Sequence, residues 1–210
     1  MMNAARRKRE KEVRAENILD AAEQVFFGKG FARTSMEEIA LHAGASRALL
    51  YVYFKDKAAI MRGIMLRAAQ ALLLRLQAAF AAGDSGLAQL EGFGWAYYRF
   101  SLEQSDYFDV LTNLNTFPLP DEPCPLFEEV RKCSEQLNLL LVTALENGIQ
   151  DGSLCRQRVA DPVLTANFLE GALHGVIMQT RSASIDECQY PDDATLIRYT
   201  IGMLLHSLRN

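Results

Sequence analysis

A short glycine turn followed by polar and basic residues is the segment best suited to binding chemistry. Gly44 lies in an Ala-Gly-Ala turn, and Ser46, Arg47 and Ala48 come directly after it. Glycine adopts the positive φ that a tight turn between two helices needs. Ser46 can cap the N-terminus of a helix, and the amide groups in the first turn of such a helix can bind phosphates. Arg47 can bond phosphates or the edge of a guanine base. The spacing predicts a helix-turn-helix whose second helix enters a major groove.

The flanking residues supply the signals that position such a motif. Ser35-x-x-Glu38 is a capping-box pattern, and Gly28 and Gly30 precede it as a helix stop. Apolar residues upstream recur with the spacing of one helix face. These signals predict helices over residues 10–28, 36–42 and 46–54, followed by a long helix over 57–82.

The segment from Gly30 to Lys57 closely resembles the N-terminal domain of the TetR family of transcriptional regulators. The matching pattern is Gly30-Phe31-x-x-Thr34-Ser35-Met36-x-x-Ile39-Ala40-x-x-Ala43-Gly44-Ala45-Ser46-Arg47-x-x-Leu50-Tyr51-x-Tyr53-Phe54-x-x-Lys57. A looser resemblance to the family's C-terminal regulatory domain is carried by Ala144-Leu145-x-x-Gly148-x-x-x-Gly152-x-Leu154, Asp161-Pro162 and Gly171-Ala172-Leu173-x-Gly175. Together the two matches cover most of the chain.

The resemblance implies a set of DNA-binding residues. Thr34, Ser35 and Lys57 correspond to phosphate contacts, and Arg47 to a base or phosphate contact. The full implied set is Thr34, Ser35, Ser46, Arg47, Ala48, Tyr51, Tyr53 and Lys57. The two tyrosines could instead be core aromatics with a hydroxyl at the surface.

Three positions of the second helix depart from the family pattern. Ala48 stands where glycine or another small residue is common. Leu49 stands where threonine is frequent, and Val52 stands where histidine is frequent. Either residue could touch a thymine methyl group or pack inward. The reading surface is therefore expected to be more apolar than is usual in the family.

Charge divides the chain into a basic part and an acidic part. Residues 1–67 hold 13 Lys/Arg and 8 Asp/Glu, whereas residues 68–210 hold 9 Lys/Arg and 18 Asp/Glu, so the overall charge of −4 is misleading. The basic run contains Arg6, Arg7, Lys8, Arg9, Lys11 and Arg14. By itself it could be a solvated, frayed terminus, but ahead of a helix-turn-helix we expect it to contact the DNA backbone or minor groove.

The whole chain is expected to be all-α, with about nine helices and no sheet. We expect a three-helix DNA-binding domain with a basic N-terminal arm over residues 1–56, and a helical regulatory domain over 57–210. Further helices are predicted over residues 87–103, 105–116, 126–149, 162–181 and 193–208. The proline-rich segment 117–125 and residues 182–191 are expected to be irregular.

The acidic part carries aromatic and polar candidates for a ligand site. The candidates are Trp95, Tyr98, Phe108, Asn115, Phe117, Asn167 and His174. No Lys/Arg cluster accompanies them, so an apolar or aromatic effector is favoured over a strongly anionic one. Most of these aromatics could simply be core, and His174 could be an interior or interface histidine.

The last two helices are expected to form a homodimer interface. Gly171-x-x-x-Gly175 permits close approach of another helix. The apolar residues of 196–208 cover more of the helix surface than a single contact face within the chain would need. The family resemblance implies a four-helix dimer interface, and a single-chain core is the alternative.

The sequence excludes or disfavours several classes of protein. The N-terminus lacks a secretory signal, which predicts a cytoplasmic protein, and three arginines within Ala58–Ala82 argue against a membrane span. Cys124, Cys133, Cys155 and Cys188 form no C-x-x-C pair, so no metal site is expected. Hydrolase and metalloprotease motifs are absent, so neither an enzyme nor a cofactor is expected.

The sequence therefore favours a repressor that leaves a palindromic operator in duplex DNA when a small apolar molecule binds. An activator of the same fold is an alternative, as is a helical interaction module without specific DNA binding. We expect no membrane partner for the leading hypothesis.

Overall fold

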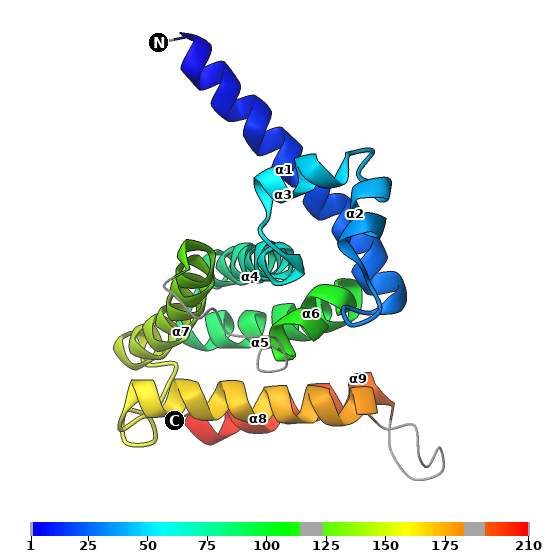
Figure 1. Cartoon of the computed structure of the whole chain (residues 1–210). Coiled ribbons are helices and arrows are strands. Elements are labelled where there is room, and N and C mark those ends of the chain that lie inside the picture. The colour runs from blue at the N-terminus through cyan, green and yellow to red at the C-terminus, as the bar shows by residue number, and fades with distance from the viewer. Residues whose placement is uncertain (1, 114–123, 183–191, 210) are drawn as a thin grey trace. The chain divides into compact units, whose positions relative to one another are not determined.

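The computed structural model describes residues 2–113, 124–182 and 192–209, and within these ranges it has nine helices and no strand (Figure 1). The helices are α1 (Met2–Lys29), α2 (Met36–His42), α3 (Arg47–Tyr53), α4 (Lys57–Ala81), α5 (Gly86–Glu103), α6 (Ser105–Thr112), α7 (Pro125–Asp151), α8 (Pro162–Ser182) and α9 (Asp193–Leu208). The predicted all-α class is confirmed. The predicted irregular segment 117–125 and loop 182–191 lie almost entirely outside the described residues.

The chain divides into two compact units. The N-terminal unit comprises residues 1–68 and 109–129, and the C-terminal unit comprises 69–108 and 130–210. The division falls within α4, whereas the sequence placed a domain boundary at the start of that helix. The boundary at residue 56 remains a prediction.

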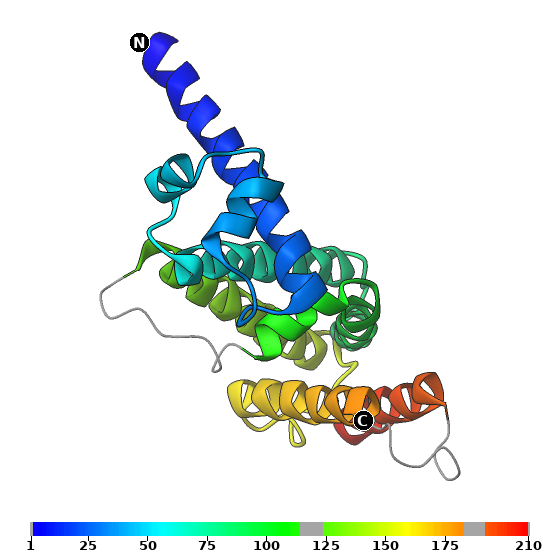
Figure 2. The ribbon, with the colours of Figure 1, turned by 45° about the vertical axis from the view of Figure 1, so that its right-hand side comes forward.

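The core of the N-terminal unit is built from the apolar faces of short helices. α2 lies against α1, and α3 lies against α2 (Figures 1 and 2). Ile18 of α1, Ile39 of α2 and Leu50 of α3 are fully buried. Fully burying such a side chain contributes about 1.5–3 kcal/mol. The helix face predicted in the first helix is therefore the face that enters the core.

The first helix begins earlier than the sequence pattern indicated. It starts at Met2 rather than near Glu10, so the basic run is helical. Ion pairs with i,i+4 spacing join Arg6 to Glu10 and Lys8 to Glu12. Such pairs stabilise a helix by about 0.2–0.5 kcal/mol each, which compensates in part for the lack of apolar periodicity.

Contacts among α5, α8 and α9 organise the C-terminal unit. α8 and α9 lie side by side, and α5 contacts both (Figure 1). At the start of α5, Gly86 lies so close to Gly148 of α7 that a Cβ atom added to Gly86 would be 2.0 Å from the Gly148 nitrogen. Asp151 accepts a hydrogen bond from the Gly86 amide at 2.7 Å, so the end of α7 caps the start of α5.

α4 is a long helix rich in apolar side chains. By length and composition it could cross a membrane, as the core helices of other folds also could. Its buried side chains include Ile60, Ile64 and Leu76, which are at most 1% exposed. Burial of these side chains within the fold is consistent with a core helix.

Candidate nucleic-acid interface

The turn between α2 and α3 has the geometry that its glycine predicts. Gly44 has φ +57°, a conformation that disfavours side chains with a Cβ. The Gly44 amide donates to the Leu41 carbonyl at 3.1 Å, and the Ala45 amide donates to the Ala40 carbonyl at 2.9 Å. These bonds end α2 tightly and direct the chain into α3.

α3 is anchored by one side and exposed on the other. Ser46 accepts a hydrogen bond from the Leu49 amide at 3.2 Å, so the predicted N-cap is present. Leu50 and Phe54 are buried, whereas Arg47, Ala48, Tyr51 and Val52 are exposed. Leu49 and Tyr53 are half-buried. Of Leu49 and Val52, Val52 is the more accessible, being 68% exposed.

Arg47 is held between two neighbours. Its Nη1 atom lies 2.5 Å from Glu37 Oε1, and its Cζ atom lies 5.7 Å from the centre of the Tyr51 ring. A hydrogen bond to Tyr51 and the negative charge of Glu37 raise the pKa of Arg47. The sequence alone does not indicate this pair, because Glu37 and Arg47 lie ten positions apart, across a turn.

The start of α2 is fixed by a confirmed capping box. The Ser35 side chain accepts from the Glu38 amide at 3.3 Å, and the Ser35 amide donates to Glu38 Oε2 at 2.9 Å. Lys29 also bonds the Glu38 carboxylate. Hydrogen bonds from Lys29 and from the backbone and hydroxyl of Ser35 lower the pKa of Glu38 to about 2.

Two predicted phosphate contacts bond the protein itself in this structure. Thr34 is buried, and its hydroxyl donates to the Gly30 carbonyl at 2.9 Å. The Lys57 ammonium donates to the Phe31 carbonyl at 2.6 Å and to the Thr34 carbonyl at 2.9 Å. It also lies 4.4 Å from the centre of the Phe31 ring. These side chains order the α1–α2 loop, and their contact with phosphates remains a prediction.

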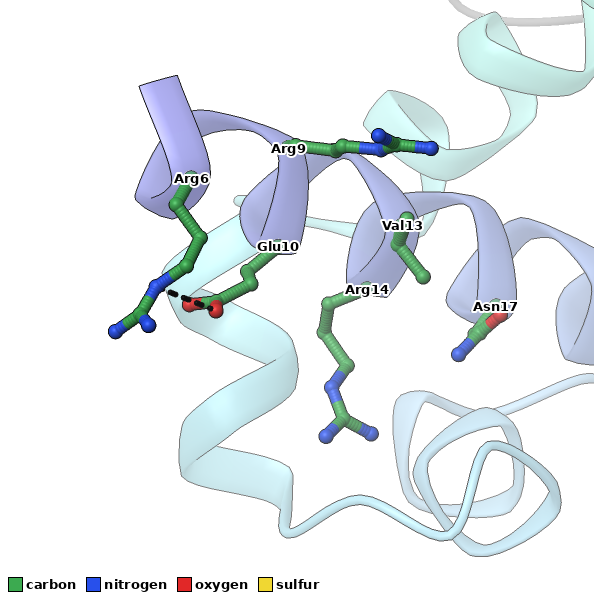
Figure 3. Close-up of a pocket in the computed structure, with 6 residues that line it drawn as sticks. All are labelled: Arg6, Arg9, Glu10, Val13, Arg14 and Asn17. Carbon is green, nitrogen blue, oxygen red and sulfur yellow. Dashed lines mark ion pairs between the residues drawn. The ribbon is translucent and has the colours of Figure 1, made fainter. Parts of the chain in front are cut away.

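The N-terminal half of α1 presents a basic face beside a shallow hollow (Figure 3). The residues around this hollow are Arg6, Arg9, Glu10, Val13, Arg14 and Asn17. Figure 3 shows Arg6 paired with Glu10, while Arg14 extends away from the helix. Three guanidinium groups on one side of a helix can contact phosphates through charge-assisted hydrogen bonds.

The predicted ligand residues of the C-terminal unit do not form one group. His174 Nδ1 lies 2.8 Å from the Tyr97 hydroxyl, and the ring centre of Phe108 lies 6.0 Å from that of His174. Burial and the charge of Glu170 raise the pKa of Tyr97, a residue that was not among the predicted contacts. Tyr97 lies among other aromatic residues of α5, and the sequence does not distinguish it from a core aromatic.

The other candidates lie elsewhere. Trp95 and Tyr98 contact each other edge to face, with ring centres 6.3 Å apart. Asn167 is exposed and donates to the Val163 carbonyl of its own helix at 2.8 Å, and its part in a ligand site remains a prediction. Asn115 and Phe117 lie outside the described residues.

No group of three or more His, Cys, Asp or Glu side chains suited to a metal ion occurs among the described residues. Within the same ranges Cys124 and Cys155 are free thiols. The α2–turn–α3 segment has an arrangement that suits nucleic-acid recognition. Two capped helices joined at a glycine turn, the second with an exposed arginine, define a helix-turn-helix domain.

Comparison with known proteins identifies the family of this domain. Residues 18–64 match the family model for bacterial regulatory proteins of the tetR family. The N-terminal domain therefore matches the TetR family over these residues. The matched residues include all of α2 and α3 and the predicted DNA-binding set.

Two curated relatives each match about a quarter of the chain. The HTH-type transcriptional repressor BepR of Brucella suis is 45% identical over 53 residues, which are 25% of this chain and 25% of BepR. The HTH-type transcriptional regulator TtgR of Pseudomonas putida is 39% identical over 54 residues, which are 26% of this chain and 25% of TtgR. The similarity thus spans about a quarter of the length of these relatives.

Solved structures extend the likeness of fold to nearly the whole chain. The TetR family regulator PfmR from Thermus thermophilus aligns with TM-score 0.67 and 21% identity over 92% of this chain and 99% of PfmR. A protein of unknown function from Rhodococcus sp. RHA1 aligns with TM-score 0.75 and 17% identity over 94% of this chain and 96% of its own. At these identities the comparison describes the fold.

Proposed function

We propose that this chain is a transcriptional regulator that binds operator DNA through α2, the Gly44 turn and α3. The observation that carries the proposal is the exposure of Arg47, Tyr51 and Val52 on a helix fixed by the Ser46 cap and by buried Leu50. A helix supported in this way enters a major groove with its first turns against the base edges. Arg47 reads guanine and Val52 touches a thymine methyl group.

The basic face of α1 adds affinity without reading sequence. Arg6, Arg9 and Arg14 surround one hollow and belong to the unit that contains α3. Each phosphate contact releases counterions from the DNA, so these residues steepen the salt dependence of binding. Because residues 2–29 are one helix, the contact is made by a helix face rather than by an extended arm.

The functional form is a homodimer assembled through α8 and α9. Phe168, Tyr199 and Met203 on these helices are each more than half exposed. A Cβ atom added at Gly171 or Gly175 would meet nothing within 4 Å, so this face has room for a second copy. Two copies place two α3 helices in successive major grooves, about 34–36 Å apart.

Repression with release by a small effector is the regulatory mode we favour, and activation is the alternative. BepR carries the name of a repressor, which supports this choice. An apolar or aromatic effector would bind in the C-terminal unit, where Tyr97 and His174 offer polar groups beside the Phe108 ring. It must prefer the conformation that does not bind DNA, because equal affinity for both conformations would shift nothing.

Selection from a randomised DNA duplex library tests the proposal directly. The purified full chain should enrich a near-palindromic sequence, and fluorescence anisotropy should show affinity for it that falls steeply with salt. Arg47→Ala should weaken binding to the selected duplex by about tenfold or more, because a bidentate guanine contact contributes about 1–3 kcal/mol of discrimination. Arg99→Ala, which removes an exposed arginine of α5, is the matched control.

Two results would contradict the proposal. Wild-type protein that enriches no sequence would remove the regulator assignment, and lipid-vesicle binding in its place would favour the helical interaction module. Full affinity of Arg47→Ala for the selected duplex would remove the assignment of α3 as the reading helix.

A further inference from the structure

The ion pair between Glu37 and Arg47 joins α2 and α3, the two helices of the helix-turn-helix, on their exposed side. Glu37 lies in the first turn of α2, and Arg47 is the first residue of α3. Their side chains are 53% and 62% exposed, and an exposed ion pair contributes little to stability. The pair therefore contributes little to the stability of the fold. Its main effect is on the position of the Arg47 side chain.

The contacts of Arg47 leave one part of the guanidinium group available. Glu37 lies against Nη1, and the Tyr51 ring lies beside the guanidinium carbon. A guanidinium group has five N–H donors in a rigid plane, so bonds to Glu37 and Tyr51 still leave further donors of the group unused. Two donors of this kind are what a bidentate contact with guanine O6 and N7 requires.

We propose that Glu37 is a specificity-determining residue, which acts by orienting Arg47 for a guanine of the operator. This inference rests on the proposed function. An arginine held before binding loses less side-chain entropy when it meets its base, and it is restrained from turning to a phosphate or another base. Glu37 is thus a positioning residue, because it acts through Arg47.

The neighbouring carboxylate shows why Glu37 is suited to this role. Glu38 is bonded to Lys29 and Ser35 in the capping box and points to the α1–α2 loop. Glu37 instead bonds across the turn to α3. The two adjacent acids therefore have separable functions, one structural and one in recognition.

A carboxylate at a DNA-binding surface has a cost that makes the inference testable. It repels phosphates regardless of base sequence, so it lowers affinity for every duplex. Removing its charge should raise affinity for unrelated DNA while lowering the preference for the operator. A purely structural role would instead reduce both affinities together.

The experiment compares wild-type protein, Glu37→Gln, Arg47→Ala and the double variant, all as full chains. The duplex enriched by wild-type protein from a randomised library and a scrambled duplex of equal length are the two probes. Glu37→Gln should reduce the ratio of the two affinities by about fivefold to tenfold and should tighten binding to the scrambled duplex. Repeated selection should show relaxed base preference at the positions that Arg47→Ala also relaxes.

The double variant separates orientation from charge. If Glu37 acts through Arg47, adding Glu37→Gln to Arg47→Ala should leave the base preference unchanged. Unaltered base preference in the single Glu37→Gln variant would overturn the inference, as would equal loss of both affinities. Failure of wild-type protein to enrich any sequence would instead overturn the proposed function, so the two failures are distinguishable.

Discussion

Glu38 links the end of α1 to the start of α2 through Lys29 and Ser35. Its pKa in the folded protein is about 2, below the ordinary value of 4.5, mainly because Lys29 bonds the carboxylate. A carboxylate whose pKa is lowered by folding stabilises the fold above the unfolded value, and that contribution is lost as the pH falls towards the folded value. The stabilising effect of Glu38 should therefore be complete above about pH 5 and should disappear between pH 4.5 and pH 2.

Thermal unfolding followed by circular dichroism tests this expectation. Glu38→Gln should unfold at a lower temperature than wild-type protein at pH 6, and the difference should shrink as the pH approaches 2. Glu12→Gln removes an exposed carboxylate from the same unit and serves as the control. A difference for Glu38→Gln that stays constant from pH 6 to pH 2 would contradict the assigned bonds.

Residues with local partners could be predicted from the sequence, and residues with distant partners could not. Ser35 and Ser46 bond amides three positions ahead, so their types and spacing were sufficient. Lys57 bonds the Phe31 carbonyl, 26 positions away in the sequence, and only the folded unit brings the two together. The Glu37–Arg47 pair was missed for the same reason.

At the level of elements, the contact between α5 and α7 depends on the absence of a side chain. A Cβ atom at Gly86 would be 2.0 Å from the Gly148 nitrogen, which is backbone and cannot turn aside. Gly86→Ala should therefore destabilise the protein by about 2–3 kcal/mol, in spite of the better helix propensity of alanine. Urea unfolding followed by circular dichroism measures the loss.

Gly28→Ala provides the matched control within α1. A Cβ atom at Gly28 would meet nothing within 4 Å, so this variant should be neutral or gain up to about 1 kcal/mol. Equal stability of the two variants would show that α5 and α7 do not approach as closely as the structure places them.

Apolar periodicity and capping residues predicted where the helices lie in the sequence. They did not predict what each helix packs against. The predicted long helix over 57–82 is α4 (Lys57–Ala81), and the predicted helix over 162–181 is α8 (Pro162–Ser182). Periodicity shows which residues share a face, yet it does not show what that face meets. Asn167 was accordingly assigned to a ligand site, although it lies exposed on α8.

For the whole molecule, charge divides along the sequence, because residues 1–67 are basic and residues 68–210 are acidic. The proposed dimer requires the exposed face of α8 to pack closely against a second copy. Gly175 has open space where a side chain would extend, so a larger residue fits within one copy. The same residue would intrude between two copies, and two-fold symmetry would make it intrude twice.

Gly175→Leu should therefore separate folding from assembly. The variant should keep the helical content of the wild-type protein, while its dimer dissociation constant should rise roughly 100-fold because overpacking costs about 1–3 kcal/mol at each of two symmetric positions. Binding to a palindromic duplex should weaken with it, since one copy reaches only one half-site. Gln150→Leu adds the same side chain at an exposed position of α7 and should change neither property. Sedimentation velocity and fluorescence anisotropy measure the two effects, and wild-type assembly by Gly175→Leu would exclude this face of α8 as the dimer interface.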